Sequence, residues 1–134
     1  MNDELRIMNG NEGKIRTFYD LNAWKIGHEV VIEIYKITKT FPKDEMFALT
    51  SQMRRCAVSI TSNIAEGFSR QSYKEKLQFY SMSQGSVTEL QNQALIAKDV
   101  EYLDATSYDM VQDKLTTLHK ILNGLIKSTR AFSR

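Results

Sequence analysis

The chain has 134 residues, of which 42% are hydrophobic, with 6 Gly, 1 Pro and a formal net charge of +2. That length fits one domain with a sizeable core, and so few Gly and Pro residues disfavour a many-turned β protein and favour long helices. The charge is too small to indicate a nucleic-acid partner by itself. The single cysteine, Cys56, excludes an internal disulfide, and its apolar neighbours predict core packing.

The first residues differ in character from the rest of the chain. Residues 1–16 carry charges throughout and contain no apolar run long enough for a signal peptide or a membrane span. We expect a flexible tail over residues 1–16, followed by a single domain over residues 17–134. The protein should therefore be cytoplasmic, with no membrane partner.

The first predicted helix covers residues 22–41. Apolar and aromatic residues recur there at helical spacing, Trp24 and Tyr35 among them, and form a wide apolar face. Pro42 lacks an N–H group and restricts the residue before it, so the helix should end at Phe41.

The second predicted helix covers residues 44–68, with Met53 and Ile60 on its apolar face. Asp44 can accept hydrogen bonds from the free N–H groups of the first turn. Gly67 stands near the other end, where it suits the left-handed position that often closes a helix.

Two further helices are predicted over residues 72–99 and 104–129. Ser72 and Glu75 have the spacing of a capping box, and Asp104 can cap the last helix. Apolar residues of the last helix alternate at spacings of three and four, which is typical of a left-handed bundle. Four helices with short links predict an all-α, antiparallel, up-down-up-down four-helix bundle.

Three glycines, Gly27, Gly85 and Gly124, fall inside predicted helices. Each costs about 1 kcal/mol relative to Ala, so we expect a packing reason for them. Gly85 has small neighbours, Ser81, Ser83 and Ser86. Together these small residues would let the backbone of another helix come close.

A polar stripe interrupts the apolar pattern of the second helix. It is rich in Ser and Asn, which prefer defined hydrogen bonds, whereas a solvated face is usually rich in Lys and Glu. We expect a partly enclosed polar network that fixes helix packing or subunit contact, with a fully solvated stripe as the alternative. Its members are Gln52, Ser59, Ser62, Asn63 and Glu66. An enclosed Glu66 would need Arg55, Arg70 or a basic residue of another helix or chain as its partner.

Enzymatic signatures are absent from the sequence. It has no glycine-rich phosphate loop, no Gly-x-Ser-x-Gly elbow and no His-Glu-x-x-His pair, and His28 and His119 fall on separate helices. Ser59 and Glu66 could be nucleophile and base, but a continuous helix supplies neither a positioned base nor an oxyanion hole. We expect a protein that is not an enzyme, without catalytic residues, metal or cofactor.

Basic residues gather between positions 54 and 76, where they outnumber the acids by three. We regard them as candidates for contact with the phosphates of nucleic acid, and they are Arg54, Arg55, Arg70, Lys74 and Lys76.

Three segments resemble a known family: "LNAWKIGHEVVIEIYKITKTFPKDE", "LTSQMRRCAVSITSNIAEGFSR" and "FYSMSQGSVTEL". They are similar to the bacterial 23S ribosomal RNA intervening-sequence proteins, over roughly residues 18–128. The resemblance implies an antiparallel four-helix bundle, a ring of five chains and a link to RNA biology, with no settled activity and no catalytic residues. Similar proteins include the accessory subunit of diversity-generating retroelements, which binds nucleic acid and a reverse transcriptase through a basic ring.

Two functions are compatible with the sequence. The first is a non-enzymatic homo-oligomer, a pentamer by the resemblance, that binds structured RNA or DNA through its basic residues. The alternative is a scaffold or accessory subunit whose partner is another protein and which has no direct nucleic-acid contact.

Overall fold

The structure is a computed structural model that describes residues 14–133, so most of the expected tail lies outside the described part. Four long helices and two short 3-10 turns make up this part of the chain, with no strand. The elements are η1 (Phe18–Asp20), α2 (Asn22–Thr38), η2 (Lys43–Glu45), α3 (Leu49–Ser69), α4 (Tyr73–Asp99) and α5 (Ala105–Phe132). The all-α prediction is confirmed.

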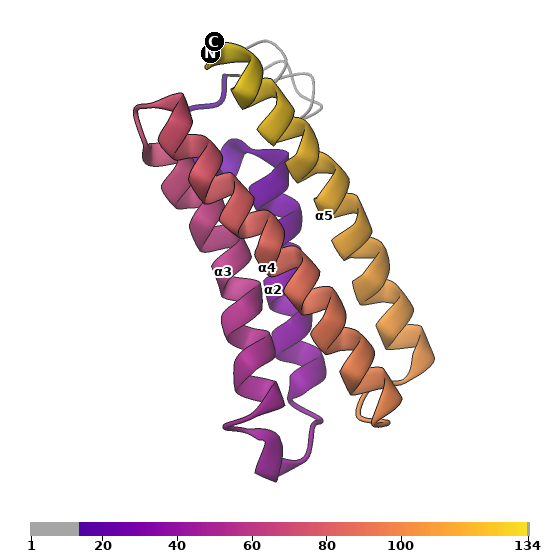
Figure 1. The fold of residues 1–134 in the computed structure, drawn as a ribbon. Helices are drawn as coiled ribbons and strands as arrows, with labels where there is room; N and C mark the ends of the chain where they lie inside the picture. The colour runs from indigo at the N-terminus through magenta and orange to yellow at the C-terminus, as the bar shows by residue number, and fades with distance from the viewer. Residues whose placement is uncertain (1–13, 134) are drawn as a thin grey trace.

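The helices form a bundle in which each one packs against two neighbours. The chain runs down α2, up α3, down α4 and up α5 (Figure 1). Consecutive helices pack together, and α2 closes the bundle against α5. Short links produce this antiparallel order, because a chain that turns back at once lies beside the helix it has just left.

Apolar side chains from all four helices fill the centre. Ile34, Ile60, Leu90 and Leu118 are fully buried there. Each such side chain contributes roughly 1.5–3 kcal/mol relative to an exposed one. The regular spacing of Leu residues predicted for the last helix therefore forms its buried seam.

The link between the first two long helices differs from the prediction. α2 ends at Thr38, because the next three N–H groups bond to the carbonyl three residues back, which tightens the chain into a turn. α3 begins at Leu49, five residues later than expected, after the separate turn η2. Asp44 therefore does not cap it. Glu45 accepts a hydrogen bond from the backbone N–H of Leu49 at 3.1 Å instead.

Ser72 and Asp104 each cap a later helix as predicted, although at Ser72 the described hydrogen bonds include only the hydroxyl half of the predicted capping box. The Ser72 hydroxyl accepts from the Glu75 N–H at 3.1 Å, and the Asp104 carboxylate accepts from the Ser107 N–H at 2.7 Å. α5 continues three residues beyond its predicted end at residue 129, to Phe132. Its last turn packs beside α4, where the rings of Phe132 and Tyr73 lie 6.3 Å apart.

The predicted role of Gly67 as a helix-closing residue is wrong. Gly67 lies within α3, which continues to Ser69, and its backbone does not adopt the left-handed conformation. Its small size serves close packing with α4.

The packed domain also begins earlier than residue 17. Ile15, which the sequence assigned to the tail, is 5% exposed and belongs to the core. Within the described part of the chain, no helix is long and apolar enough to cross a membrane.

Candidate functional site

A polar network joins α3 to α4 at the middle of their contact. The hydroxyl oxygens of Ser59 and Ser86 lie 2.9 Å apart, and the Asn63 amide donates to the Ser59 hydroxyl at 3.0 Å. The same amide donates to the Ser59 carbonyl at 2.9 Å. The structure thus places Ser59 and Asn63, two members of the predicted stripe, in a half-buried network that orients one helix against the other.

Two further hydrogen bonds reinforce this contact. The fully buried Ser83 hydroxyl donates to the Ile60 carbonyl at 2.8 Å, and the Cys56 thiol donates to the Ser86 carbonyl at 3.1 Å. Burial, with a smaller contribution from the nearby Glu89 carboxylate, raises the pKa of Cys56 to about 12. The thiol is therefore a core residue that stays protonated.

The other stripe residues lie outside the network. Gln52 and Ser62 are exposed. Glu66 is exposed as well, and its carboxylate lies 3.6 Å from the Arg70 guanidinium, with both side chains about half accessible to water. Surface pairs of this kind contribute about 0–1 kcal/mol, so Glu66 is not the enclosed charge that the sequence suggested.

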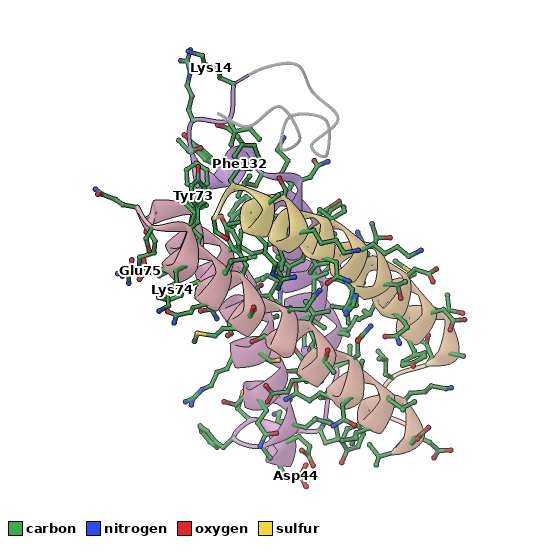
Figure 2. The ribbon with its side chains drawn as sticks, turned by 45° about the horizontal axis from the view of Figure 1, so that its top comes forward. Lys14, Asp44, Tyr73, Lys74, Glu75 and Phe132 are labelled. Carbon is green, nitrogen blue, oxygen red and sulfur yellow. The ribbon has the colours of Figure 1, made fainter. Side chains whose placement is uncertain are left out.

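The five basic candidates do not form one patch. Arg55 and Lys74 are exposed, and neither forms an ion pair with a described residue. Figure 2 shows Lys74 near the end of the bundle opposite to Asp44. Arg70 lies over the Phe79 ring, with its guanidinium carbon 4.7 Å from the ring centre.

Lys76 has a structural role. Its ammonium donates to the Phe68 carbonyl at 2.7 Å and to the Gly67 carbonyl at 3.4 Å, near the end of α3. Burial lowers the pKa of this ammonium. The ammonium therefore caps the end of α3, where it joins the Arg70 N–H at the Gly67 carbonyl, and its hydrogen bonds within the subunit compete with any contact to phosphate.

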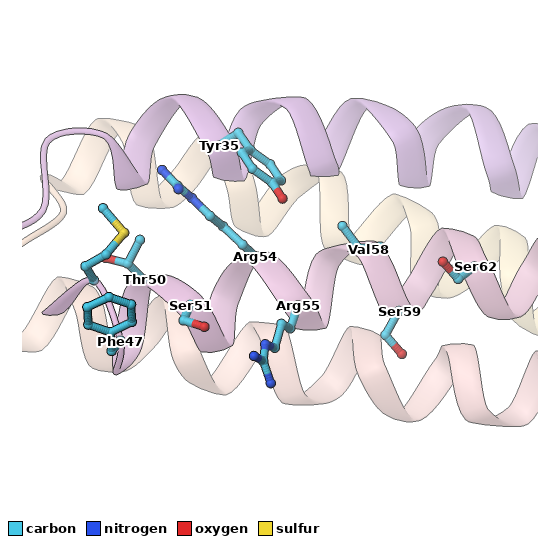
Figure 3. A pocket seen from close by; sticks show the side chains of 10 residues that line it. Tyr35, Phe47, Thr50, Ser51, Arg54, Arg55, Val58, Ser59 and Ser62 are labelled. Carbon is cyan, nitrogen blue, oxygen red and sulfur yellow. The ribbon is translucent and has the colours of Figure 1, made fainter.

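A hollow of about 630 Å³ opens beside the first turns of α3. Its wall includes Tyr35, Phe47, Arg54, Arg55, Ser51 and Ser59, and none of the described residues that line it is Asp or Glu. In Figure 3, Arg54 reaches toward Tyr35 on α2, whereas Arg55 points away from α2. The hollow thus brings two arginines and two aromatic rings together.

Phe47 is the most exposed large apolar side chain at this hollow, with 96% of its surface accessible. It stands in the turn between η2 and α3. Phe47 is not among the candidate site residues predicted from the sequence. Its exposure follows from the late start of α3, which puts Phe47 in the turn before the helix.

The outer side of α4 carries a second row of residues, which we call the outward row. Its members are Met82, Gly85, Glu89, Asn92 and Ile96, all of them exposed. They recur at spacings of three and four, opposite to the buried residues of the same helix. A Cβ at Gly85 would meet no atom of the described residues within 4 Å, so the described part of the subunit does not require this glycine.

Sequence reasoning identified the small residues around Gly85 but missed Met82 and Ile96, although their spacing was readable. Apolar residues fall on opposite sides of α4, so the helix lacks one clearly apolar face and one clearly polar face.

Among the described residues, no three His, Cys, Asp or Glu side chains come together in a way that could hold a metal ion.

Comparisons with known proteins agree with the fold. Residues 19–124 match the family described as 23S rRNA-intervening sequence protein. No curated protein matches the chain. The crystal structure of a protein of unknown function from the S23 ribosomal protein family of Bacteroides thetaiotaomicron is similar, with a TM-score of 0.73 and 21% sequence identity. The likeness covers 78% of this chain and 95% of that one, and at this identity it shows the fold alone.

Proposed function

Because the chain belongs to the 23S rRNA-intervening sequence protein family, we propose that it is a non-enzymatic bundle protein that assembles with further copies of itself in the cytoplasm. The contact between copies uses the outward row of α4. The assembly is a pentamer, which is the state that the family resemblance implies.

The outward row carries this proposal. Met82 is 56% exposed and Ile96 is 43% exposed, with Gly85 between them on the same row. An exposed glycine inside a helix costs about 1 kcal/mol relative to Ala, and no close contact with another described residue offsets that cost. A close approach by another copy would account for both the glycine and the apolar side chains beside it.

Native mass spectrometry of the full chain tests the assembly. We expect a multiple of the 15.5 kDa subunit mass, and a monomer when both Met82 and Ile96 are changed to Ser. Met110→Ser is the matched control, because Met110 is 47% exposed and belongs to a different helix, α5, and this variant should keep the native mass. A native chain that is monomeric, or a double variant that stays assembled, would contradict the proposal.

A second candidate function is contact with nucleic acid, which the family's link to ribosomal RNA intervening sequences suggests. It is favoured by the exposed side chains of Arg55 and Lys74, which lack acidic partners among the described residues, and by the absence of Asp and Glu from the described wall of the hollow. Binding should weaken with salt, with a slope of about 0.9 per phosphate contact on duplex DNA. If neither RNA nor DNA binds at low salt, the function is that of a scaffold for protein partners only.

A further inference from the structure

The hollow beside α3 has the chemistry of a site for a flat, negatively charged ligand. It is an open groove of about 630 Å³, which would leave one side of a bound ligand exposed to water. Aromatic rings, guanidinium groups and hydroxyls line it, and none of its described lining residues is acidic. A ligand that combines a flat ring with negative charge fits this wall.

One cation of the hollow is held rigidly. Arg54 donates from Nε to the Thr38 hydroxyl at 2.9 Å, and its guanidinium carbon lies 4.8 Å from the centre of the Tyr35 ring. Thr38 is 2% exposed and donates in turn to the Ile34 carbonyl at 2.6 Å. The terminal nitrogens of Arg54 form no ion pair with a described residue, so their positive charge faces the hollow without neutralisation.

The second cation differs from the first. Arg55 is exposed and points away from α2 (Figure 3), so its guanidinium is free to follow a phosphate. Together the two arginines offer one fixed and one adaptable phosphate contact, on different sides of the same hollow.

Phe47 supplies the flat surface. At 96% exposure its ring is open to water, and no described aromatic ring stacks on it. Aromatic side chains that stand free beside a basic groove are the stacking platforms of proteins that bind single-stranded nucleic acid. In a duplex the bases cover one another, so only an unpaired base can offer its face to such a ring.

We propose that the hollow receives an unpaired base of RNA or DNA, stacked on Phe47, with the adjoining phosphates at Arg54 and Arg55. The proposal rests on the second candidate function, nucleic-acid contact, and is independent of the assembly through α4. It specifies that the bound nucleotides are unpaired and that Phe47 produces this preference.

Fluorescence anisotropy on the full chain tests the proposal with a labelled single-stranded RNA, the single-stranded DNA of the same sequence and the duplex of that DNA. The native chain should bind a single strand more tightly than the duplex. Phe47→Leu, which keeps an apolar side chain but removes the ring, should weaken single-strand binding roughly tenfold and leave duplex binding unchanged. Phe47→Tyr should bind like the native chain.

Substitution of the cations separates charge from stacking. Arg55→Gln should weaken binding to every probe and lower the salt slope by about one. Lys74→Gln removes an equal charge far from the hollow, so it should keep the preference for single strands. Because Phe47, Arg55 and Lys74 are all exposed, none of these variants should unfold the chain.

Three results would overturn the proposal. In the first, Phe47→Leu binds single strands as tightly as the native chain does; the protein then still binds nucleic acid, but not by stacking on Phe47. In the second, no probe binds at low salt, and the second candidate function fails as well. In the third, Phe47→Leu lowers the native mass of the assembly, which would identify the hollow as a contact between copies.

Discussion

Gly67 packs so closely against Tyr80 that a Cβ on Gly67 would lie 2.7 Å from ring carbon Cε1 and 2.8 Å from Cδ1. Tyr80 is 2% exposed, so its ring has no open space to move into. This contact sets the distance between the last turns of α3 and the first turns of α4. It also explains why a glycine is placed inside a helix, where it lowers helix stability.

Gly67→Ala should lower the free energy of unfolding by about 1–3 kcal/mol, because the added methyl group overpacks the interface. Urea unfolding followed by circular dichroism measures the change. In a Tyr80→Leu background, which removes the ring, the same substitution should cost clearly less. Equal costs in both backgrounds would mean that the contact between Gly67 and Tyr80 does not limit the packing.

Lys76→Gln should lower the free energy of unfolding by about 0.5–1.5 kcal/mol, because the carbonyl of Phe68 loses its charged donor. Lys74→Gln is the matched control on the same helix, since Lys74 is exposed and contacts none of the α3 carbonyls in the described hydrogen bonds. Midpoints of urea unfolding compare the two variants. A loss of similar size in both would assign the effect to net charge.

Asp20 should make the first described turn sensitive to acid. Hydrogen bonds from the backbone N–H groups of Arg16, at 2.9 Å, and Thr17, at 3.0 Å, lower the pKa of its carboxylate below the ordinary 3.8. A lowered pKa in the folded state stabilises the fold above the ordinary value, and this contribution is lost as the pH falls through the lowered pKa.

Amide proton shifts of Arg16 and Thr17 should accordingly titrate with a midpoint below pH 3.8. The step should vanish in Asp20→Asn, which keeps the shape of the side chain but does not titrate in this range. A midpoint at or above 3.8 would show that the Arg16 and Thr17 amides do not bond to the Asp20 carboxylate when the protein is in solution.

Cys56 should react very slowly with iodoacetamide at pH 8 in the native protein. The thiol is 6% exposed, and burial raises its pKa from 9.0 to about 12, so the thiolate fraction falls roughly a thousandfold. Mass spectrometry after timed alkylation measures the rate, and alkylation in urea should go to completion. Fast native labelling would show that α3 and α4 separate readily around this residue.

The bundle was predictable because its signals are local. The buried seam of α5 and the caps at Ser72 and Asp104 depend on residues three or four positions apart, and the structure contains each of them. The turn at Lys43–Glu45 was not predictable from Asp44 alone. Asp44 and Glu45 are both acids that could accept from the free N–H groups at the start of α3. In the structure Glu45 accepts, from the N–H of Leu49.

The site was harder to predict, because neighbours on other helices determine whether a polar side chain is free. Sequence spacing put Lys76 with the phosphate candidates, yet the end of α3 binds its ammonium. The same spacing made Glu66 look enclosed, although its side chain is 51% exposed. Phe47 was not predictable, because a single exposed aromatic residue has no periodic pattern.

Gly85 gives the most direct test of the central claim, that the outward row of α4 contacts a second copy. In Gly85→Leu the new side chain extends into the open space beside the helix, where no described atom lies within 4 Å of its Cβ. Light scattering of the full chain should therefore give an assembly for the native protein and a folded 15.5 kDa monomer for the variant, with its helical circular dichroism retained. A native chain of 15.5 kDa, or a Gly85→Leu variant with the native assembled mass, would contradict the claim.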